Sequence, residues 1–336
     1  MSKILIIGNG FDLNLGLKTS YSHFIHSEQL QNLISNGNQL AAHLNKKHTL
    51  QNWVDIEHEL KQYLIRTFKI KLEYEYERNN EVVLTEQEQQ DQLKYEFIAL
   101  KNALAEYLIQ SSKTIRDMTD NNSQAAKILR CGYSKNLSTE SIRLRTPYFN
   151  EIFTFNYTNF FNSFFIGNDR KFSQIHHIHG SLENNNIVFG IEDDAFSLKN
   201  DINLLNSAPH LKYSSENHFT FLNKSDHFAF GKAPDVSNAI ANSHEIHFFG
   251  CSLGDTDNAH FRRAFKEIST QISPKTTSST KRKIYFYVYG KTGYRSIYNR
   301  IMALTDSQVS EFKLINDVTF YDLKEDKEID QEWLNQ

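Results

Sequence analysis

The sequence opens on a short apolar run that stops at a glycine turn. Residues 3–7 are Lys, Ile, Leu, Ile and Ile, and Gly8-Asn9-Gly10 follows them. A continuous, β-branched run of this kind is typical of a central strand buried on both faces of a sheet. The opening segment therefore favours an α/β protein whose first strand leads into a tight turn.

Short apolar runs return from residue 151 onward, with helical patterns between the later ones. The expected strands are Glu151–Phe155, Gln174–Ile178, Ile187–Phe189, Glu245–Phe249, Lys283–Tyr289 and Val318–Tyr321. Helical spacing of apolar residues is found over Asp257–Ile268 and Tyr294–Leu304. Because strands alternate with helices, we expect a parallel, doubly wound sheet of the Rossmann-like kind.

The region after the first strand has a different pattern. Apolar residues recur at three- and four-residue steps over 53–68 and again over 93–108, within a strongly charged background. This spacing predicts amphipathic helices. We expect a large helical insertion over residues 45–145, within a single Rossmann-like nucleotide-binding domain that spans residues 1–336.

Charge and cysteine content exclude several classes of protein. The chain has 37 basic and 40 acidic residues, so it lacks the basic excess of a duplex-DNA binder. Its densest basic cluster, Lys281–Lys283, is expected to be a solvated loop end. The two cysteines, Cys131 and Cys251, form no CxxC pair, which argues against a zinc site and against a disulfide-stapled secreted domain.

Hydrophobic segments give no sign of export or membrane insertion. The N-terminal apolar run is too short for a signal peptide. No stretch of the sequence approaches the roughly 20 apolar residues that span a bilayer. We therefore expect a cytoplasmic protein without a membrane partner.

The glycine turn after the first strand is the first candidate ligand site. Gly8 and Gly10 would allow a tight turn and the close approach of a pyrophosphate. The third glycine, Gly16, comes six residues after Gly10 rather than the usual three, so the common dinucleotide fingerprint is not met. An ordinary strand-to-helix turn accounts for the same residues.

Two later strands end in side chains that suit catalysis. Asn156 follows an apolar strand, where its amide could orient a water or bind a ribose, although capping of the next helix is the simpler interpretation of this segment alone. His179 precedes Gly180 at a strand end, and an imidazole can act as a general base near neutrality. His176 and His177 better fit hydrogen-bonded core or edge histidines. Because the three histidines lack partner ligands at a zinc spacing, we expect no metal.

A second strand-to-glycine turn spans residues 247–257. Gly250 and Ser252 could approach a ribose or phosphate, and Asp257 could accept hydrogen bonds from ribose hydroxyls. Capping of the helix that begins near Asn258 would explain one of the two aspartates, Asp255 and Asp257, but not the whole run.

Taken in order, these segments resemble the bacteriophage abortive-infection AbiH family over nearly the whole chain. Five segments carry the resemblance, and the first of them is fairly specific: Gly8–Tyr21, Trp53–Glu57, Phe155–Tyr157, His179–Ser181 and Gly250–Asp257. AbiH proteins are more distantly similar to the sirtuin-like NAD-consuming domains of antiphage systems. The four-cysteine zinc module of deacylating sirtuins is absent here, which argues against protein deacylation.

The resemblance implies roles for individual residues. Asn156 and His179 would be the catalytic pair, and Ser252 and Asp257 would line the ribose. The remaining residues expected to bind the nucleotide are Gly8, Asn9, Gly10, Phe11, Asp12, Gly16 and Gly250. Asp12 is unusual in a phosphate loop, and it would either redirect the ligand or face the nicotinamide ribose.

The expected function is that of an antiphage effector that hydrolyses NAD or a related ADP-ribosyl nucleotide. Its expected partners are a second copy of the chain or another defence protein, and a phage-derived trigger. One alternative is a silent nucleotide-binding sensor or scaffold. A weaker one is a metal-dependent nuclease or phosphatase that uses Asp12, Asp255, Asp257 and the histidines. Glu57 is a further candidate for the site, or simply a solvated acid on a helix.

Overall fold

The computed structural model of the chain describes residues 2–51, 56–57, 59–60, 62–63, 86–113, 123–125, 128, 149–159, 174–190, 222, 224, 235–254, 257–270 and 281–329. The chain divides into two compact units. Unit 1 comprises residues 1–18, 112–186 and 233–336, and unit 2 comprises residues 19–111 and 187–232. The expected bounds of the insertion, 45–145, and the single domain of 1–336 stay predictions.

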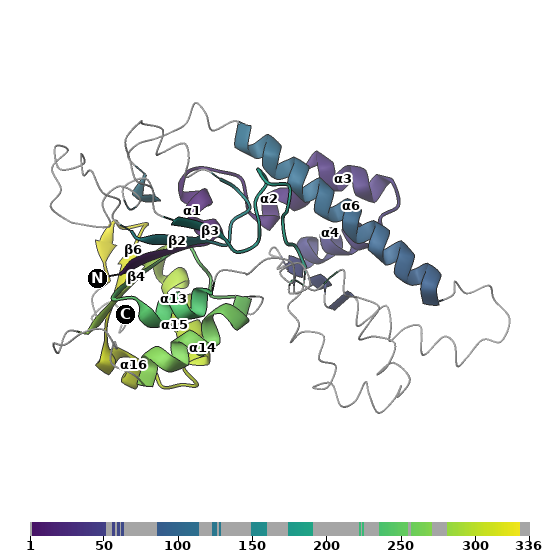
Figure 1. The fold of residues 1–336 in the computed structure, drawn as a ribbon. Coiled ribbons are helices and arrows are strands. Elements are labelled where there is room, and N and C mark those ends of the chain that lie inside the picture. The colour runs from purple at the N-terminus through teal and green to yellow at the C-terminus, as the bar shows by residue number, and fades with distance from the viewer. Residues whose placement is uncertain are drawn as a thin grey trace. The chain divides into compact units, whose positions relative to one another are not determined.

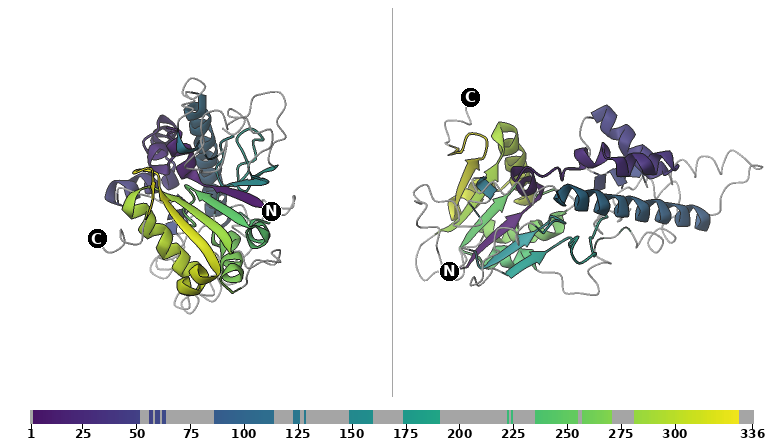
Figure 2. Two further views of the ribbon diagram at one scale, coloured as in Figure 1. Left: turned by 90° about the vertical axis from the view of Figure 1, so that its left-hand side faces the viewer. Right: turned by 90° about the horizontal axis from the view of Figure 1, so that it is seen from above.

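Unit 1 is built on a sheet that, among the described residues, has seven strands. Their order is β3-β2-β1-β4-β5-β6-β7, and every pair is parallel except β6 and β7. The strands are β1 (Lys3–Ile7), β2 (Glu151–Thr154), β3 (Gln174–His177), β4 (Glu245–Phe249), β5 (Arg282–Val288), β6 (Asn316–Asp322) and β7 (Lys327–Glu328). A largely parallel sheet in an α/β protein, as the strand and helix patterns predicted, is thus confirmed. Figure 2 shows β1, in purple, between its neighbours.

The order of the strands reverses at β1. The chain runs outward from β1 through β2 to β3, and then returns to place β4 on the other side of β1. In open α/β sheets, ligands bind outside the carboxyl ends of the strands at such a reversal. The register also aligns the last residues of four strands, because Ile7 pairs with Thr154 and Phe249, and Thr154 pairs with His177. The residues that follow these strands therefore gather at one edge.

One face of the sheet packs against helices and forms the larger core. Ile4 and Ile6 of β1 contribute to this face, together with Phe248 of β4. The helices that contribute buried side chains to the same cluster are α13 (Val236–Asn242), α14 (Asn258–Thr270), α15 (Gly290–Leu304) and α16 (Val309–Ile315). Figure 1 shows these four helices together on one side of the strands. The helices expected over 257–268 and 294–304 are confirmed as α14 and α15.

The opposite face has its own core. Leu5 and Ile7 of β1 point into it and meet Phe11 of α1 (Asn9–Asn14). Ala125 and Phe149 belong to the same cluster. Since residues 4–7 of β1 are fully buried, with alternate side chains on opposite faces, the expectation of a central strand covered on both sides is confirmed.

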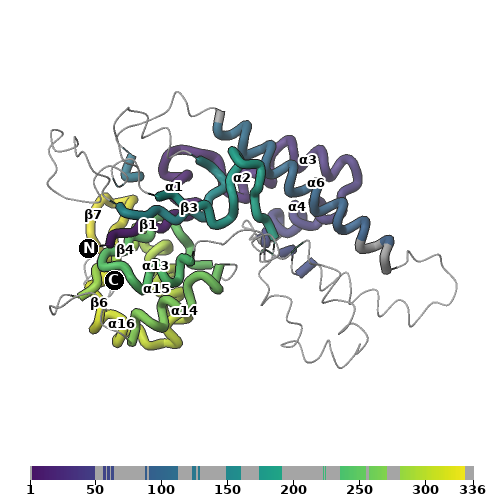
Figure 3. The backbone as a smooth tube through the Cα atoms, in the orientation of Figure 1, coloured from purple at the N-terminus to yellow at the C-terminus, as the bar shows by residue number. Residues whose placement is uncertain are grey.

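Most of the described residues of unit 2 are helical. Its helices are α2 (Tyr21–Ile25), α3 (Glu28–Ser35), α4 (Gln39–Gln51) and α6 (Glu86–Lys113), and Figure 3 traces them. Ser20, Ser27 and Asn38 accept hydrogen bonds from backbone N–H groups at the starts of the three shorter helices, as N-cap side chains do. Within the described residues, no helix combines the length and the apolar character needed to cross a membrane.

Two sequence expectations are wrong. Ile187–Phe189 forms no strand; instead Phe189 is fully buried and stacks on Phe97 of α6, with ring centroids 5.6 Å apart. Arg282 is not part of a solvated loop end, because it begins β5 and is only 2% exposed. In the segment 53–68, Ile56 and Leu60 are helical and buried, whereas the other apolar positions lie outside the described residues.

Candidate functional site

The glycine turns that follow β1 and β4 are packed backbone against backbone. The N–H of Gly8 donates to the carbonyl of Phe249 at 3.1 Å, and the N–H of Gly10 donates to that of Gly250 at 3.0 Å. A Cβ atom on Gly10 would lie 2.6 Å from the Cα of Gly250, and Gly250 itself has a φ of +59°. Close packing and backbone conformation thus account for these three glycines.

This packing has a consequence for phosphate binding. The N–H of Phe11 donates to the carbonyl of Gly8 at 2.9 Å, so the N–H groups of Gly8, Gly10 and Phe11 all bond within the protein. The Phe11 side chain is fully buried and lies edge-on to Phe249. Asn9 is exposed. The backbone of this turn therefore offers a ligand fewer donors than the sequence pattern indicated.

Gly16 has a different role from the other glycines. It has a φ of +84°, and its N–H donates to the carbonyl of Leu13, while the N–H of Leu17 donates to that of Asp12. These two bonds form the Schellman motif that ends a helix, here α1, and glycine is favoured at its left-handed position. Helix termination thus explains Gly16.

Asp12 lies on α1 and is buried, with 2% of its surface exposed. Its Oδ1 accepts a hydrogen bond from the Asn156 amide at 2.9 Å, and its Oδ2 accepts one from the Thr158 hydroxyl at 2.5 Å. Burial raises the pKa of Asp12 to about 7, although both hydrogen bonds oppose the rise. Asp12 is therefore a carboxyl group whose charge changes near neutral pH.

Asn156 links the turn after β1 to the end of β2. Its side-chain amide donates to the carbonyl of Gly8 at 3.1 Å as well as to Asp12, and its backbone N–H donates to the hydroxyl of Thr154 at 3.1 Å. An N-cap side chain accepts hydrogen bonds from backbone N–H groups, whereas this side chain donates two. The described contacts therefore do not support the capping role that the sequence alone favoured.

His179, beyond the end of β3, meets Asp257 from the turn after β4. Its Nε2 lies 2.9 Å from Oδ1 of Asp257, which is an ion-pair distance, but the two groups are not aligned as a hydrogen bond requires. The His179 side chain is 6% exposed and that of Asp257 is 16% exposed. The His179 ring also lies edge-on to Phe155, at a centroid distance of 5.3 Å. An imidazole and a carboxylate are thus held together at the same edge.

The other two histidines of the segment lie elsewhere on β3. The Nε2 of His176 contacts Oε2 of Glu151 at 2.9 Å, and its ring stacks on Phe153. Burial lowers the pKa of His177, while a hydrogen bond with the Asn156 backbone and the charge of Glu183 oppose the change. Within the described ranges, no group of three or more His, Cys, Asp or Glu side chains is placed to hold a metal ion. Asp255 lies outside those ranges.

The predicted residues fall into two contact groups with three outliers. Direct contacts join Gly8, Gly10, Phe11, Asp12, Asn156 and Gly250, and His179 and Asp257 form a second pair. Asn9 and Ser252 are exposed, and Gly16 ends α1.

Sequence reasoning missed one residue, Thr158. Its contact with Asp12 was not expected from the sequence. The sequence feature that could have indicated Thr158 is its place two residues after Asn156, beyond the same strand end.

Glu57 lies in unit 2 rather than in the sheet unit. It is 5% exposed, and its Oε2 lies 2.8 Å from Nζ of Lys224, which is also buried. The alternative interpretation as a solvated acid is therefore wrong. Trp53 and Asp55 of the same sequence segment lie outside the described residues.

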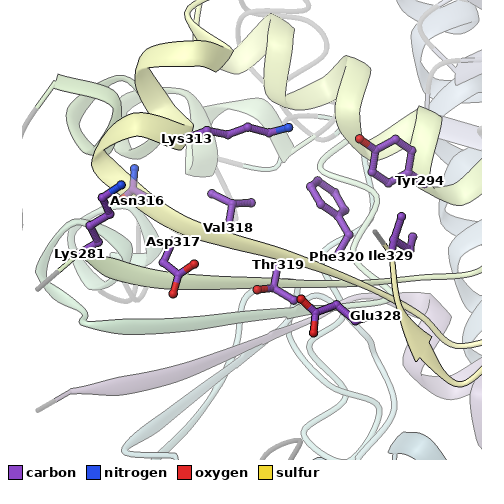
Figure 4. Close-up of a pocket in the computed structure, with 10 residues that line it drawn as sticks. All are labelled: Lys281, Tyr294, Lys313, Asn316, Asp317, Val318, Thr319, Phe320, Glu328 and Ile329. Carbon is purple, nitrogen blue, oxygen red and sulfur yellow. The ribbon is translucent and has the colours of Figure 1, made fainter. Parts of the chain in front are cut away.

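A groove of about 350 Å³ lies along β6 and shares no residue with the candidate site. Figure 4 shows Lys313 and Tyr294 on one side of the β6 backbone and Asp317 and Glu328 on the other. Two lysines, Lys281 and Lys313, balance the two acids in its lining, so its charge does not select an anion or a cation.

Fold and site together define an α/β protein with buried polar side chains at the carboxyl edge of a largely parallel sheet. A family model described as bacteriophage abortive infection AbiH matches residues 4–278 of the chain. The chain therefore belongs to the AbiH family, as the sequence motifs predicted, and to the proteins of abortive infection, a defence against phage. No curated protein and no solved structure matches the chain.

Proposed function

We propose that this AbiH protein is an NAD⁺ glycohydrolase that works at the carboxyl edge of a Rossmann-like sheet. The observation that carries the proposal is the placement of Asn156 and His179 beyond neighbouring strands, each buried and each in contact with a carboxylate. The order of the six parallel strands supports a nucleotide ligand, because dinucleotide-binding sheets have the same 3-2-1-4-5-6 order.

The chemistry of the site suits cleavage of the nicotinamide–ribose bond. When this bond breaks, its electron pair goes to the ring nitrogen of nicotinamide, and positive charge develops on the ribose. Fixed carboxylates stabilise such a charge, and Asp257, paired with His179, supplies one at this edge. Water then adds to the anomeric carbon, and His179 accepts its proton as a general base. The products are nicotinamide and ADP-ribose.

The contacts of the glycine turn indicate how the nucleotide would lie. The N–H groups of Gly8, Gly10 and Phe11 are bonded within the protein, and carboxylates repel phosphate. We therefore place the nicotinamide ribose, rather than the diphosphate, beside Asn156 and His179. In this pose, hydroxyl groups of the ribose would donate hydrogen bonds to the side-chain oxygen of Asn156 and to the carboxylate of Asp257.

Unrestrained NAD⁺ cleavage would kill the host before any infection. We therefore propose that the activity is held in check until a phage component is present, through a second copy of the chain or a partner defence protein. Depletion of NAD⁺ after infection would stop phage replication at the expense of the infected cell.

The test is nicotinamide release from NAD⁺ by the purified full chain, followed by chromatography, with lysate of phage-infected cells added as a source of trigger. We expect release by the wild type and its loss in His179→Ala and Asn156→Ala. His176→Gln is the matched control, because His176 lies on β3 and contacts Glu151 at the start of β2. Release that persists in both variants, or ADP-ribose binding without any release, would contradict the proposal.

A further inference from the structure

We propose that Asp12 is a positioning residue of this site: it holds the Asn156 amide so that only the carbonyl oxygen of that amide is presented to a ligand hydroxyl. The identity of the ligand rests on the proposed function. The role of Asp12 rests on the contacts of Asn156 alone.

The two hydrogen atoms of the Asn156 amide are already committed. One is donated to the Gly8 carbonyl and the other to Oδ1 of Asp12. If the amide were turned over, its oxygen would face two acceptors, and both contacts would become repulsive. The acceptor pair of Gly8 and Asp12 therefore fixes the orientation of the amide, and Oδ1 is the remaining polar atom of the side chain.

Asp12 acts through Asn156 and not on the ligand. It is 2% exposed, and its two oxygens are bonded to Asn156 and Thr158. An ionised Asp12 polarises the amide and makes its carbonyl oxygen a stronger acceptor. A neutral Asp12 can still accept from Asn156 and donate to Thr158, so the geometry persists while the polarisation is lost.

Presentation of a carbonyl oxygen defines the chemical class of the bound group. An acceptor binds hydroxyl groups, such as those of a ribose, and it cannot bind the oxygens of a phosphate. The carboxylate of Asp257, which lies against His179, has the same preference. The part of the ligand that meets Asn156 is therefore a sugar hydroxyl or a water molecule that is held for attack.

Because burial raises the pKa of Asp12 to about 7, the polarisation changes within an accessible pH range. Among the described residues, other titratable groups near this edge include His177 on β3, whose ring bonds to the Asn156 backbone, and Glu183, whose charge acts on His177. They also include the pair of His179 and Asp257, and Cys251 in the turn after β4. Substitutions that change Asp12 alone separate its contribution from theirs.

The first arm of the test needs no ligand. The side-chain amide signals of Asn156, assigned with Asn156→Asp, are followed by NMR between pH 5 and 9 in the full chain. In the wild type we expect the chemical shifts of these signals to change with a midpoint near pH 7. In Thr158→Val the midpoint should move to higher pH, because the hydrogen bond from Thr158 lowers the pKa of Asp12. In Asp12→Asn this titration should be absent. Signals that do not respond to pH would overturn the proposal, as would an unchanged midpoint in Thr158→Val.

The second arm measures ADP-ribose binding by calorimetry at pH 6 and pH 8.5. We expect the wild type to bind about threefold more tightly at the higher pH, because the amide is then polarised by a charged partner. Asp12→Asn, which keeps the shape and the acceptor, should show a smaller difference in affinity between the two pH values than the wild type. Equal pH dependence in the wild type and Asp12→Asn would overturn the role of Asp12. Absence of nicotinamide release would overturn only the proposed hydrolysis.

Discussion

Oδ1 of Asp12 and the side-chain nitrogen of Asn156 are 2.9 Å apart, although 144 positions separate the two residues in the sequence. The contact joins α1 to the end of β2 and lies beside the reversal of strand order at β1. A short helix and a strand end, each ordinary by itself, are thus tied together where an open α/β sheet binds its ligands.

The stability of the protein should depend on pH through Asp12. Its pKa is raised in the folded state, so the folded protein keeps a proton that the unfolded chain loses near pH 4. The contribution of Asp12 to the free energy of unfolding is fully present below about pH 4 and falls as the pH rises towards 7. Above pH 7 it does not change further. The total loss is on the order of a few kcal/mol. Urea denaturation should show a smaller decline from pH 4.5 to 7.5 in Asp12→Asn than in the wild type. A parallel decline in both proteins would contradict the raised pKa.

The close packing of the two glycine turns predicts a large cost for Gly10→Ala. The added Cβ would lie 2.6 Å from the backbone of Gly250, which cannot move without displacing β4, so we expect a loss of about 2–3 kcal/mol of unfolding free energy. Gly293→Ala in α15 is the control, because its Cβ would meet only ordinary contacts from 3.6 Å. That change should stabilise the helix by up to about 1 kcal/mol. Similar effects in both variants would rule out the packing explanation.

The buried side chain of Arg282 should contribute strongly to the free energy of unfolding. Its guanidinium donates to the carbonyl of Ala241 in the last turn of α13, to that of Ser243 directly after this helix, and to the side chain of Asn316. Arg282→Met leaves those acceptors unsatisfied, so we expect thermal and urea denaturation to show a loss of about 3 kcal/mol. Arg263→Met, an exposed position on α14, should change stability by less than about 0.5 kcal/mol. Equal tolerance of the two changes would be inconsistent with the buried network.

The buried pair of Glu57 and Lys224 in unit 2 lends itself to a double-mutant cycle. Removal of either partner takes away the opposite charge that lies 2.8 Å from a buried charged group, so Glu57→Leu and Lys224→Met should each cost about 3–5 kcal/mol. The double variant should be more stable than either single one, because no charge is left buried. Additive losses in urea denaturation would show that the two side chains are not coupled.

Strand positions were predictable where burial on both faces left a continuous apolar run. The runs at 151–155, 245–249 and 318–321 all became parallel strands of the sheet. The similar run Ile187–Phe189 did not, because packing against a helix selects the same apolar side chains as packing within a sheet. Short elements such as α16 and β7 carry too few residues to show a period.

The candidate site could be located only in part. Strand-end positions identified Asn156 and His179, because parallel strands present their carboxyl ends at one edge. The partners of these two residues come from distant segments, so local sequence did not show that Asp12 holds Asn156 or that Asp257 meets His179. Arg282 was misjudged for the same reason, since its acceptors lie 34 to 41 positions away.

The most direct measurement of the proposed function is the NAD⁺ level over time in cells that express the wild type or His179→Ala, with and without phage. Depletion only in infected cells with the wild type, together with loss of protection in His179→Ala, is the predicted result. Unchanged NAD⁺ in infected wild-type cells that remain protected would contradict NAD⁺ cleavage as the basis of defence.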